Sequence, residues 1–212
     1  MKRQESDGMK QSKIDSFFLE LDHEFRKPAE VIITGAACAA LMGYVRPSAD
    51  IDFEIRLKKS GSRDQDQALF ARAVGQSSKK TALAANYSED ISHWSMIDYL
   101  DYRKKAKPYK TFGRLRVKLM APEHWTIGKM GRFLALDILD MRKVIQRKRL
   151  KPDALIKTWA RAFRLSPLSL AKGQFRDHVI YFLQNYGKAV WGRAFDSEAA
   201  IHNFYKFAHI KL

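Results

Sequence analysis

Residues 31–57 read VIITGAACAALMGYVRPSADIDFEIRL, and this stretch decides the expected fold. It starts with a β-branched run at 31–33, turns at Thr34-Gly35 and continues through small residues over 36–42. These features are typical of a strand, a tight turn and a closely packed helix. Over 49–57, apolar and polar residues alternate with period two, which indicates a half-buried strand.

Asp50 and Asp52 stand two apart on the expected strand, so both carboxylates project from the same face. Two neighbouring hard oxygen ligands are typical of Mg²⁺ sites that complete their shell with substrate phosphates. The alternative is a pair of solvent-facing carboxylates, and Glu54 on the same face fits that alternative. The preceding turn favours the metal hypothesis, because the backbone N–H groups of Gly35 and Ala36 can approach a phosphate closely.

Further segments complete the expected sheet and its helices. Spacings of three and four predict an amphipathic helix over 12–25, with an apolar stripe of Ile14, Phe17, Phe18, Leu21 and Phe25. A second helix is expected over 66–74. Alternating patterns predict strands at 92–102 and 113–120, and the polar side of the second is entirely basic.

From Pro122 onward the pattern is helical, with breaks expected near 151–152, 166–167 and Gly187. The aromatic residues of this part predict a helical core rather than a surface on which bases stack.

The expected fold class is therefore α+β. A small mixed β-sheet core flanked by helices is predicted over residues 1–121, followed by an all-helical C-terminal region over 122–212.

The composition is that of a globular protein of the cytoplasm. Apolar residues make up 46% of the 212 residues, and the chain has no apolar run long enough to cross a membrane, so no membrane partner is expected. Cys38 is the only cysteine, which excludes an intramolecular disulfide and a zinc ribbon. Because Cys38 lies in the small-residue helix, we expect it to pack rather than to react.

The formal net charge is +16, and the charge is unevenly placed. Residues 103–151 carry 16 Lys and Arg against three acidic residues, a net +13. A surplus of this size favours a polyanionic partner such as nucleic acid or nucleotide. The alternatives are a solvated basic face and, with less weight, attraction to a membrane surface.

Two blocks of the chain resemble the DNA polymerase β nucleotidyltransferase superfamily. The first is IITGAACAALMGYVRPSADID at 32–52, in which a strand, a glycine turn and a helix precede a strand bearing Asp-x-Asp. The second is LMAPEHWTIGK at 119–129 with the following Gly131-Arg132 and DILD at 137–140, which is similar to the abortive-infection (AbiEii-like) toxin branch. Together the blocks cover roughly residues 30–145.

The resemblance implies a set of metal and nucleotide ligands. Mg²⁺, or Mn²⁺ in its place, would be bound by Asp50, Asp52 and a third carboxylate. Asp98 is the first candidate for that third ligand and Asp101 the second. The expected nucleotide-binding residues are Thr34, Gly35, Ala36, Arg46 and Lys129.

The second block implies two further roles. Lys129 would reach a phosphate of the nucleotide, and Asp137 on the following helix would order that lysine or the acceptor. Two departures from the family pattern stand out. Ala36 replaces the usual second Gly or Ser of the turn, and Leu136 stands where the toxin branch often has Lys or Arg directly before the aspartate.

The implied activity is transfer of a nucleoside monophosphate from an NTP to an RNA or protein acceptor, in a toxin–antitoxin or phage-defence setting. The alternative is a nucleotidyltransferase-fold protein without catalytic activity that binds RNA or an acidic partner protein through its basic surface.

Overall fold

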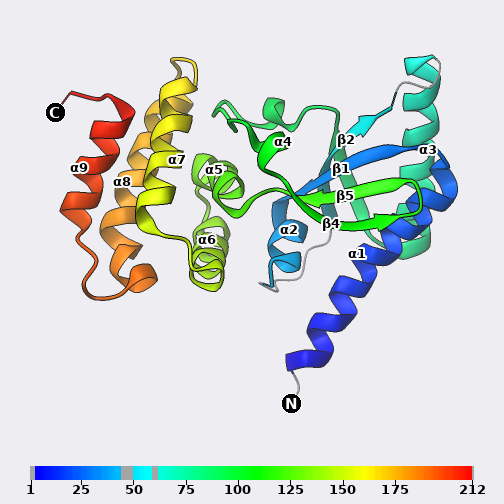
Figure 1. Cartoon of the computed structure of the whole chain (residues 1–212), viewed down its shortest axis with the longest axis horizontal. Helices are drawn as coiled ribbons and strands as arrows, with labels where there is room; N and C mark the ends of the chain where they lie inside the picture. The colour runs from blue at the N-terminus through cyan, green and yellow to red at the C-terminus, as the bar shows by residue number, and fades with distance from the viewer. Residues whose placement is uncertain (1–2, 44–49, 59–61, 212) are drawn as a thin grey trace. The chain divides into compact units, whose positions relative to one another are not determined.

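The computed structural model describes residues 3–43, 50–58 and 62–211. The chain divides into two compact units. The sheet unit comprises Met1–Ile91 and Lys105–Met120, and the helical unit comprises Ser92–Lys104 and Ala121–Leu212 (Figure 1). The α+β class is confirmed: a mixed five-stranded sheet with flanking helices is followed by a helical C-terminal region. Residues 92–104 lie in the helical unit, whereas the prediction assigned them to the first domain.

The sheet has the strand order β3-β2-β1-β5-β4. Its strands are β1 (Ala29–Thr34), β2 (Asp50–Leu57), β3 (Ala84–Ser88), β4 (Lys107–Phe112) and β5 (Leu115–Leu119). The pairs β1–β2 and β4–β5 are antiparallel, whereas β1–β5 and β2–β3 are parallel. The parallel connection from β2 to β3 runs through α3 (Arg63–Thr81), as a crossover between parallel strands requires.

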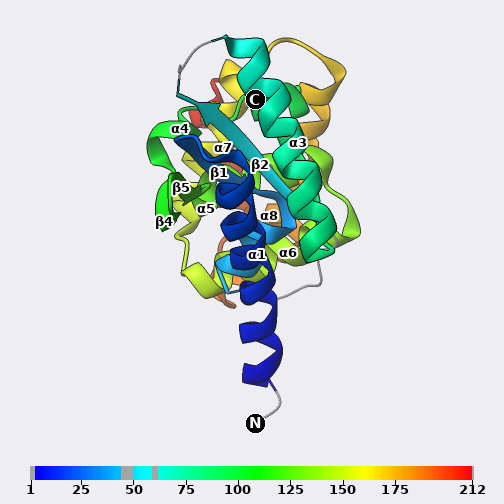
Figure 2. The same cartoon turned by 90° about the vertical axis from the view of Figure 1, so that its right-hand side faces the viewer.

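One face of the sheet is apolar and carries two helices, α1 (Arg3–Phe25) and α3, which lie side by side (Figure 2). The predicted stripe of α1 is confirmed, since all five of its apolar residues are buried. Phe53 at the middle of β2 contacts Phe17 of α1 and Phe70 of α3, with ring centroids 6.2 and 6.4 Å away. Because side chains alternate along a strand, the residues on either side of Phe53 project to the opposite, polar face.

The short helix α2 (Gly35–Leu41) follows β1 directly and contacts β1 and β2. Its small side chains permit this close approach, and Ala37, Cys38 and Ala39 are buried. Cys38 packs as predicted, with its Sγ 3.7 Å from the backbone oxygen of Met120.

The helical unit contains α4 (Tyr102–Lys105, at its border), α5 (Pro122–Arg132), α6 (Ala135–Lys148), α7 (Pro152–Leu165), α8 (Leu170–Trp191) and α9 (Ser197–Ala208). The aromatic core is confirmed: Trp159, Phe175, Phe182 and Phe204 are fully buried. The breaks near 151–152 and 166–167 are also confirmed.

The predicted break at Gly187 is wrong, because α8 continues through it to Trp191. A Cβ on Gly187 would lie 2.2 Å from the ring of Phe195. This glycine therefore allows the segment after α8 to fold back against the helix.

The predicted strand at 92–102 is also wrong. The structure has a 3₁₀ turn at Ile91–Trp94 and then irregular chain up to α4. Side chains of this segment bond its own backbone: the Ser95 hydroxyl accepts from the N–H of Ile97, and the Asp98 carboxylate accepts from the N–H of Leu100. Such local bonds form turns in competition with a sheet ladder.

Two strands that the sequence pattern did not reveal, β3 and β4, form the two edges of the sheet. Both are short and largely exposed, with Asn86 in β3 and Pro108 in β4. Edge strands with polar residues and proline resist pairing with other chains and lack the alternation of half-buried strands. The strand predicted at 113–120 is confirmed as β5. No helix in the described ranges is long and apolar enough to span a membrane.

Candidate metal centre

The candidate site lies on the polar face of the sheet, where three strands bring short polar side chains into one row. In the strand register, Asp52 of β2 pairs with Thr34 of β1 on one side and with Asn86 of β3 on the other. Asp50 precedes Asp52 by two residues and shares its face. The two predicted aspartates are thus on one face, and both are partly exposed.

Asn86 joins the two aspartates. Its side-chain Nδ2 donates to Asp50 Oδ2 at 3.1 Å and to Asp52 Oδ1 at 3.0 Å. One amide group therefore fixes the orientation of both carboxylates. Sequence reasoning missed Asn86, although a helical crossover after β2 places the next strand parallel to a neighbour in the same sheet. The run at 84–88 is itself too short and too polar to predict that strand.

Gly35 lies against the same carboxylates. Its φ is +61°, and a Cβ built on it would lie 2.0 Å from Asp52 Oδ2. Only glycine combines this left-handed backbone with the approach of an aspartate. The turn from β1 into α2 consequently brings backbone next to Asp52, and the expected approach of this backbone to a phosphate stays a prediction.

Three other residues predicted to bind the nucleotide are Thr34, Ala36 and Arg46. The Thr34 hydroxyl contacts Met120 Sδ at 3.7 Å and does not cap α2. Ala36 lies in the first turn of α2. Arg46 falls outside the described residues.

Glu54, which shares the polar face, is a structural residue. It is completely buried, and its carboxylate accepts a hydrogen bond from the N–H of Ile91 at 3.2 Å. On β5, the ammonium of Lys118 lies 2.8 Å from Glu30, so part of the basic side of that strand is neutralised within the sheet.

Asp98 and Asp101, the predicted third carboxylates, belong to the helical unit. The N–H of Asp98 donates to the Ser166 hydroxyl at 2.9 Å, in addition to the turn that its carboxylate forms. Asp101 Oδ1 lies 3.5 Å from His124 Nε2 and 3.7 Å from Arg161. Burial acts to raise the pKa of Asp101, but its own backbone N–H, the hydrogen bond from His124 and the charge of Arg161 outweigh burial and leave the pKa below its usual value.

Lys129 and Asp137 are part of a buried ion network between α5 and α6. The Lys129 ammonium lies 2.9 Å from Asp137 and 2.8 Å from Asp140, and the three side chains are 5%, 1% and 1% exposed. Arg132 bonds Asp137 from the outer side at 2.6 Å. Burial acts to raise the pKa of Asp137, but the bonds from Arg132 and Lys129 overcome it, so the pKa is lowered.

This network bears on the predicted roles. Asp137 bonds Lys129, and its expected role of ordering that lysine or the acceptor for transfer stays a prediction. The Lys129 ammonium is enclosed by carboxylates of its own unit, so its contact with a nucleotide phosphate stays a prediction.

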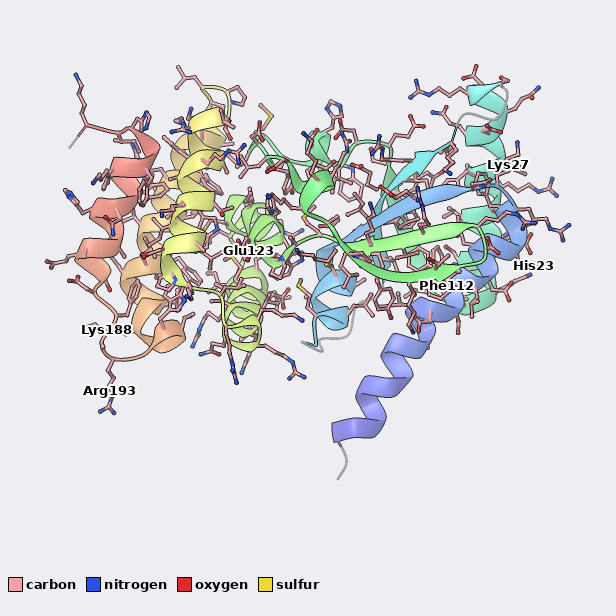
Figure 3. The ribbon with its side chains drawn as sticks, viewed as in Figure 1. His23, Lys27, Phe112, Glu123, Lys188 and Arg193 are labelled. Carbon is pink, nitrogen blue, oxygen red and sulfur yellow. The ribbon has the colours of Figure 1, made fainter. Side chains whose placement is uncertain are left out.

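A third cluster of possible ligands lies on α1, where Glu20, His23 and Glu24 have ligand atoms within 4.8 Å of one another. Figure 3 shows His23 on this helix. The ammonium of Lys80 bonds both glutamates, at 2.9 and 2.7 Å, and so already provides a cation for their two carboxylates. We therefore do not assign a metal to this cluster.

Comparison of the chain with protein-family models, curated proteins and solved structures found no match.

The donor set on the sheet fits a divalent metal ion. Two carboxylates on one face supply hard oxygen ligands, the type that Mg²⁺ and Mn²⁺ prefer. The missing Cβ of Gly35 lets the Asp52 carboxylate lie directly against the backbone of the turn, which a side chain at position 35 would prevent. Asp50 and Asp52 would hold the ion, with the backbone of the Gly35 turn adjacent.

Proposed function

We propose that this protein is a Mg²⁺-dependent nucleotidyltransferase that moves a nucleoside monophosphate from an NTP to an RNA or protein acceptor. The observation that carries the proposal is the aspartate pair, Asp50 and Asp52, beside a glycine turn whose backbone approaches Asp52. The arrangement matches what the resemblance to the polymerase β superfamily implies for residues 32–52.

Each residue of the site has a part in such a reaction. A bound Mg²⁺ would supply charge neutralisation for the phosphates of the NTP. Asp50 and Asp52 would bind the ion, and in its absence Asn86 donates a hydrogen bond to each carboxylate. Gly35 has no Cβ and so allows the Asp52 carboxylate to lie against the backbone of the turn. The protein therefore acts mainly by positioning groups and by balancing charge.

The remaining expectations belong to the same proposal. Asp98, with Asp101 second, is the proposed third carboxylate. Lys129 and Arg46 are the proposed cationic contacts of the nucleotide. A toxin–antitoxin or phage-defence setting and a place in the cytoplasm follow from the resemblance and the composition.

The test is transfer of label from each α-labelled NTP, with Mg²⁺, to total RNA and to cell protein. The variant is Asp50→Asn with Asp52→Asn, which keeps the shape of both side chains and removes their charge. Asp64→Asn is the matched control, because Asp64 is an exposed aspartate of the same unit. We expect transfer by the wild type and the control and none by the double variant, and the labelled species identifies nucleotide and acceptor. Equal transfer by the double variant would refute the proposal.

A second candidate function, RNA binding without catalysis, is favoured by a separate basic surface on the helical unit. This basic surface consists of Lys143, Arg147, Lys148, Arg149, Lys151, Lys188 and Arg193, all of them exposed. Within the part of the chain that the structure describes, none of the seven forms an ion pair. Figure 3 shows Lys188 and Arg193 at the end of α8 that leads into α9.

Two hydrogen bonds hold the segments of the basic surface together. Gln146 Nε2 donates to the backbone oxygen of Ala189, and Trp191 Nε1 donates to that of Leu150, both at 2.9 Å. The end of α6 is thereby attached to the end of α8. The positive charges are thus held on adjoining segments, an arrangement suited to a phosphate backbone.

RNA affinity as a function of salt concentration tests this candidate. Replacing Arg147, Lys148 and Arg149 by Gln should weaken binding and reduce the slope of log K against log salt by about two to three. The control replaces three exposed lysines of the sheet unit, Lys13, Lys79 and Lys107, by Gln. The same loss in variant and control would mean that net charge rather than this surface binds RNA. RNA binding without any label transfer would favour this second function.

A further inference from the structure

The side-chain amide of Asn86 bonds the carboxylates of both Asp50 and Asp52. Its NH₂ group has two N–H donors, and each is directed to one carboxylate, Asp50 at 3.1 Å and Asp52 at 3.0 Å. The amide nitrogen is therefore the group that bridges the two negative charges in the structure. Its register position directly opposite Asp52 fixes the side chain there.

The NH₂ group cannot ligate a cation, but the other end of the same amide can. The amide nitrogen and oxygen exchange places by rotation about the terminal torsion of Asn, which is broad and roughly two-fold. The oxygen of an Asn side chain is a normal ligand of hard divalent ions. Asn86 is exposed, so its amide has room to turn. One rotation thus removes two donors and supplies a ligand oxygen.

We propose that Asn86 is a ligand of the metal centre, in the sheet unit beside Asp50 and Asp52, and that its amide turns from donor to ligand when the ion binds. This inference rests on the proposed metal centre of Asp50 and Asp52, but not on the transfer reaction. Asp50, Asp52 and Asn86 together carry a charge of −2, which one divalent ion neutralises. We therefore expect one tightly bound ion in the absence of nucleotide.

In the rival role, Asn86 is not a ligand but a clasp: its two N–H donors hold the carboxylates of Asp50 and Asp52 together and compete with the ion for them. The two roles predict opposite effects of Asn86→Leu, which is similar in size but has neither donor nor acceptor. If Asn86 is only a clasp, its removal frees both carboxylates and the ion binds as tightly as before or more tightly. If Asn86 is a ligand, the ion binds more weakly.

The experiment is a Mn²⁺ titration of the full chain without nucleotide or acceptor, followed by the electron paramagnetic resonance signal of free Mn²⁺. The Asp50→Asn, Asp52→Asn double variant gives the background. We expect one site in the wild type, a loss of affinity of about tenfold or more in Asn86→Leu, and a gain of about tenfold in Asn86→Asp, because ligand number and charge set affinity. Circular dichroism in EDTA checks that each variant folds.

A second measurement follows the amide directly. Asn86→Leu identifies the side-chain NH₂ signals of Asn86 in a ¹⁵N–¹H spectrum, and these signals should shift on addition of diamagnetic Mg²⁺ as their two hydrogen bonds are lost. Unchanged signals at saturating Mg²⁺, or wild-type Mn²⁺ affinity in Asn86→Leu, would overturn the inference.

The outcomes separate this inference from the proposed function. The predicted order of Mn²⁺ affinities without any nucleotidyl transfer would refute the transferase and leave the role of Asn86 intact. Transfer that depends on Asp50 and Asp52, with unchanged Mn²⁺ affinity in Asn86→Leu, would refute only the role of Asn86. Wild-type binding no stronger than that of the double variant would refute the metal centre and the inference together.

Discussion

The Gly35→Ala substitution tests the geometry of the candidate site most directly. Gly35 has a φ of +61°, and an added Cβ would lie 2.0 Å from Asp52 Oδ2 and 2.8 Å from Asp52 Cγ. Real Cβ atoms do not tolerate such contacts, so either the Asp52 side chain or the turn has to move. The substitution should therefore disturb both the fold and the position of the carboxylate.

The expected cost has two parts. Alanine in the left-handed region costs about 1 to 2 kcal/mol. Forcing an extra methyl group into an occupied space costs about 1 to 3 kcal/mol more. We expect Gly35→Ala to lower the free energy of unfolding by about 2 to 5 kcal/mol, the sum of the two.

A double-mutant cycle with Asp52→Ala separates the two parts. Asp52→Ala removes the two closest contacts, so Gly35→Ala should cost about 1 to 3 kcal/mol less in that background. The control is Gly75→Ala in α3, where nothing lies within 4 Å of an added Cβ, and it should be neutral or stabilising.

Hydrogen exchange over β1 and β2 is the appropriate assay. All four tryptophans lie in the helical unit, at positions 94, 125, 159 and 191, so tryptophan fluorescence does not report on the sheet. An equal cost of Gly35→Ala in the wild-type and Asp52→Ala backgrounds would contradict the contact between Gly35 and Asp52.

Three further predictions concern the helical unit. Lys129→Met removes the ammonium that two buried carboxylates, Asp137 and Asp140, share, and should cost about 3 to 5 kcal/mol in urea unfolding followed by tryptophan fluorescence, whereas exposed Lys143→Met should change little. The pKa of Asp137 lies below its usual value in the folded protein. Its ionised form therefore stabilises the fold at any pH above the usual Asp pKa, and this stabilisation is lost as the pH falls through the lowered pKa. Asp137→Asn should reduce the fall of the melting temperature at acid pH. If the fall is unchanged in this variant, other titrating side chains cause it. Gly187→Ala should lower the melting temperature through overlap with Phe195, and Phe195→Ala should relieve the effect if the overlap is its cause.

Several features of this protein followed from the sequence alone. Period-two alternation placed Asp50 and Asp52 on one face of β2, and the apolar stripe over 12–25 predicted the helix that covers the opposite face. The glycine turn before α2 was recognised from its small residues. Such features depend on local spacing, which any stretch of chain displays by itself.

Other features were decided only by tertiary structure. The neighbour of β2 is β3, whose short polar pattern does not predict a strand, and the connection through α3 brings Asn86 against both aspartates. The segment around Asp98 alternates like a strand, yet its side chains bond its own backbone. Lys129 has the pattern of a surface lysine but is buried, because α5 and α6 bring two aspartates around it. Strand pairing and ion pairing join residues that are far apart in the chain, and turn formation competes with strand pairing. Local periodicity therefore cannot predict which of them occurs.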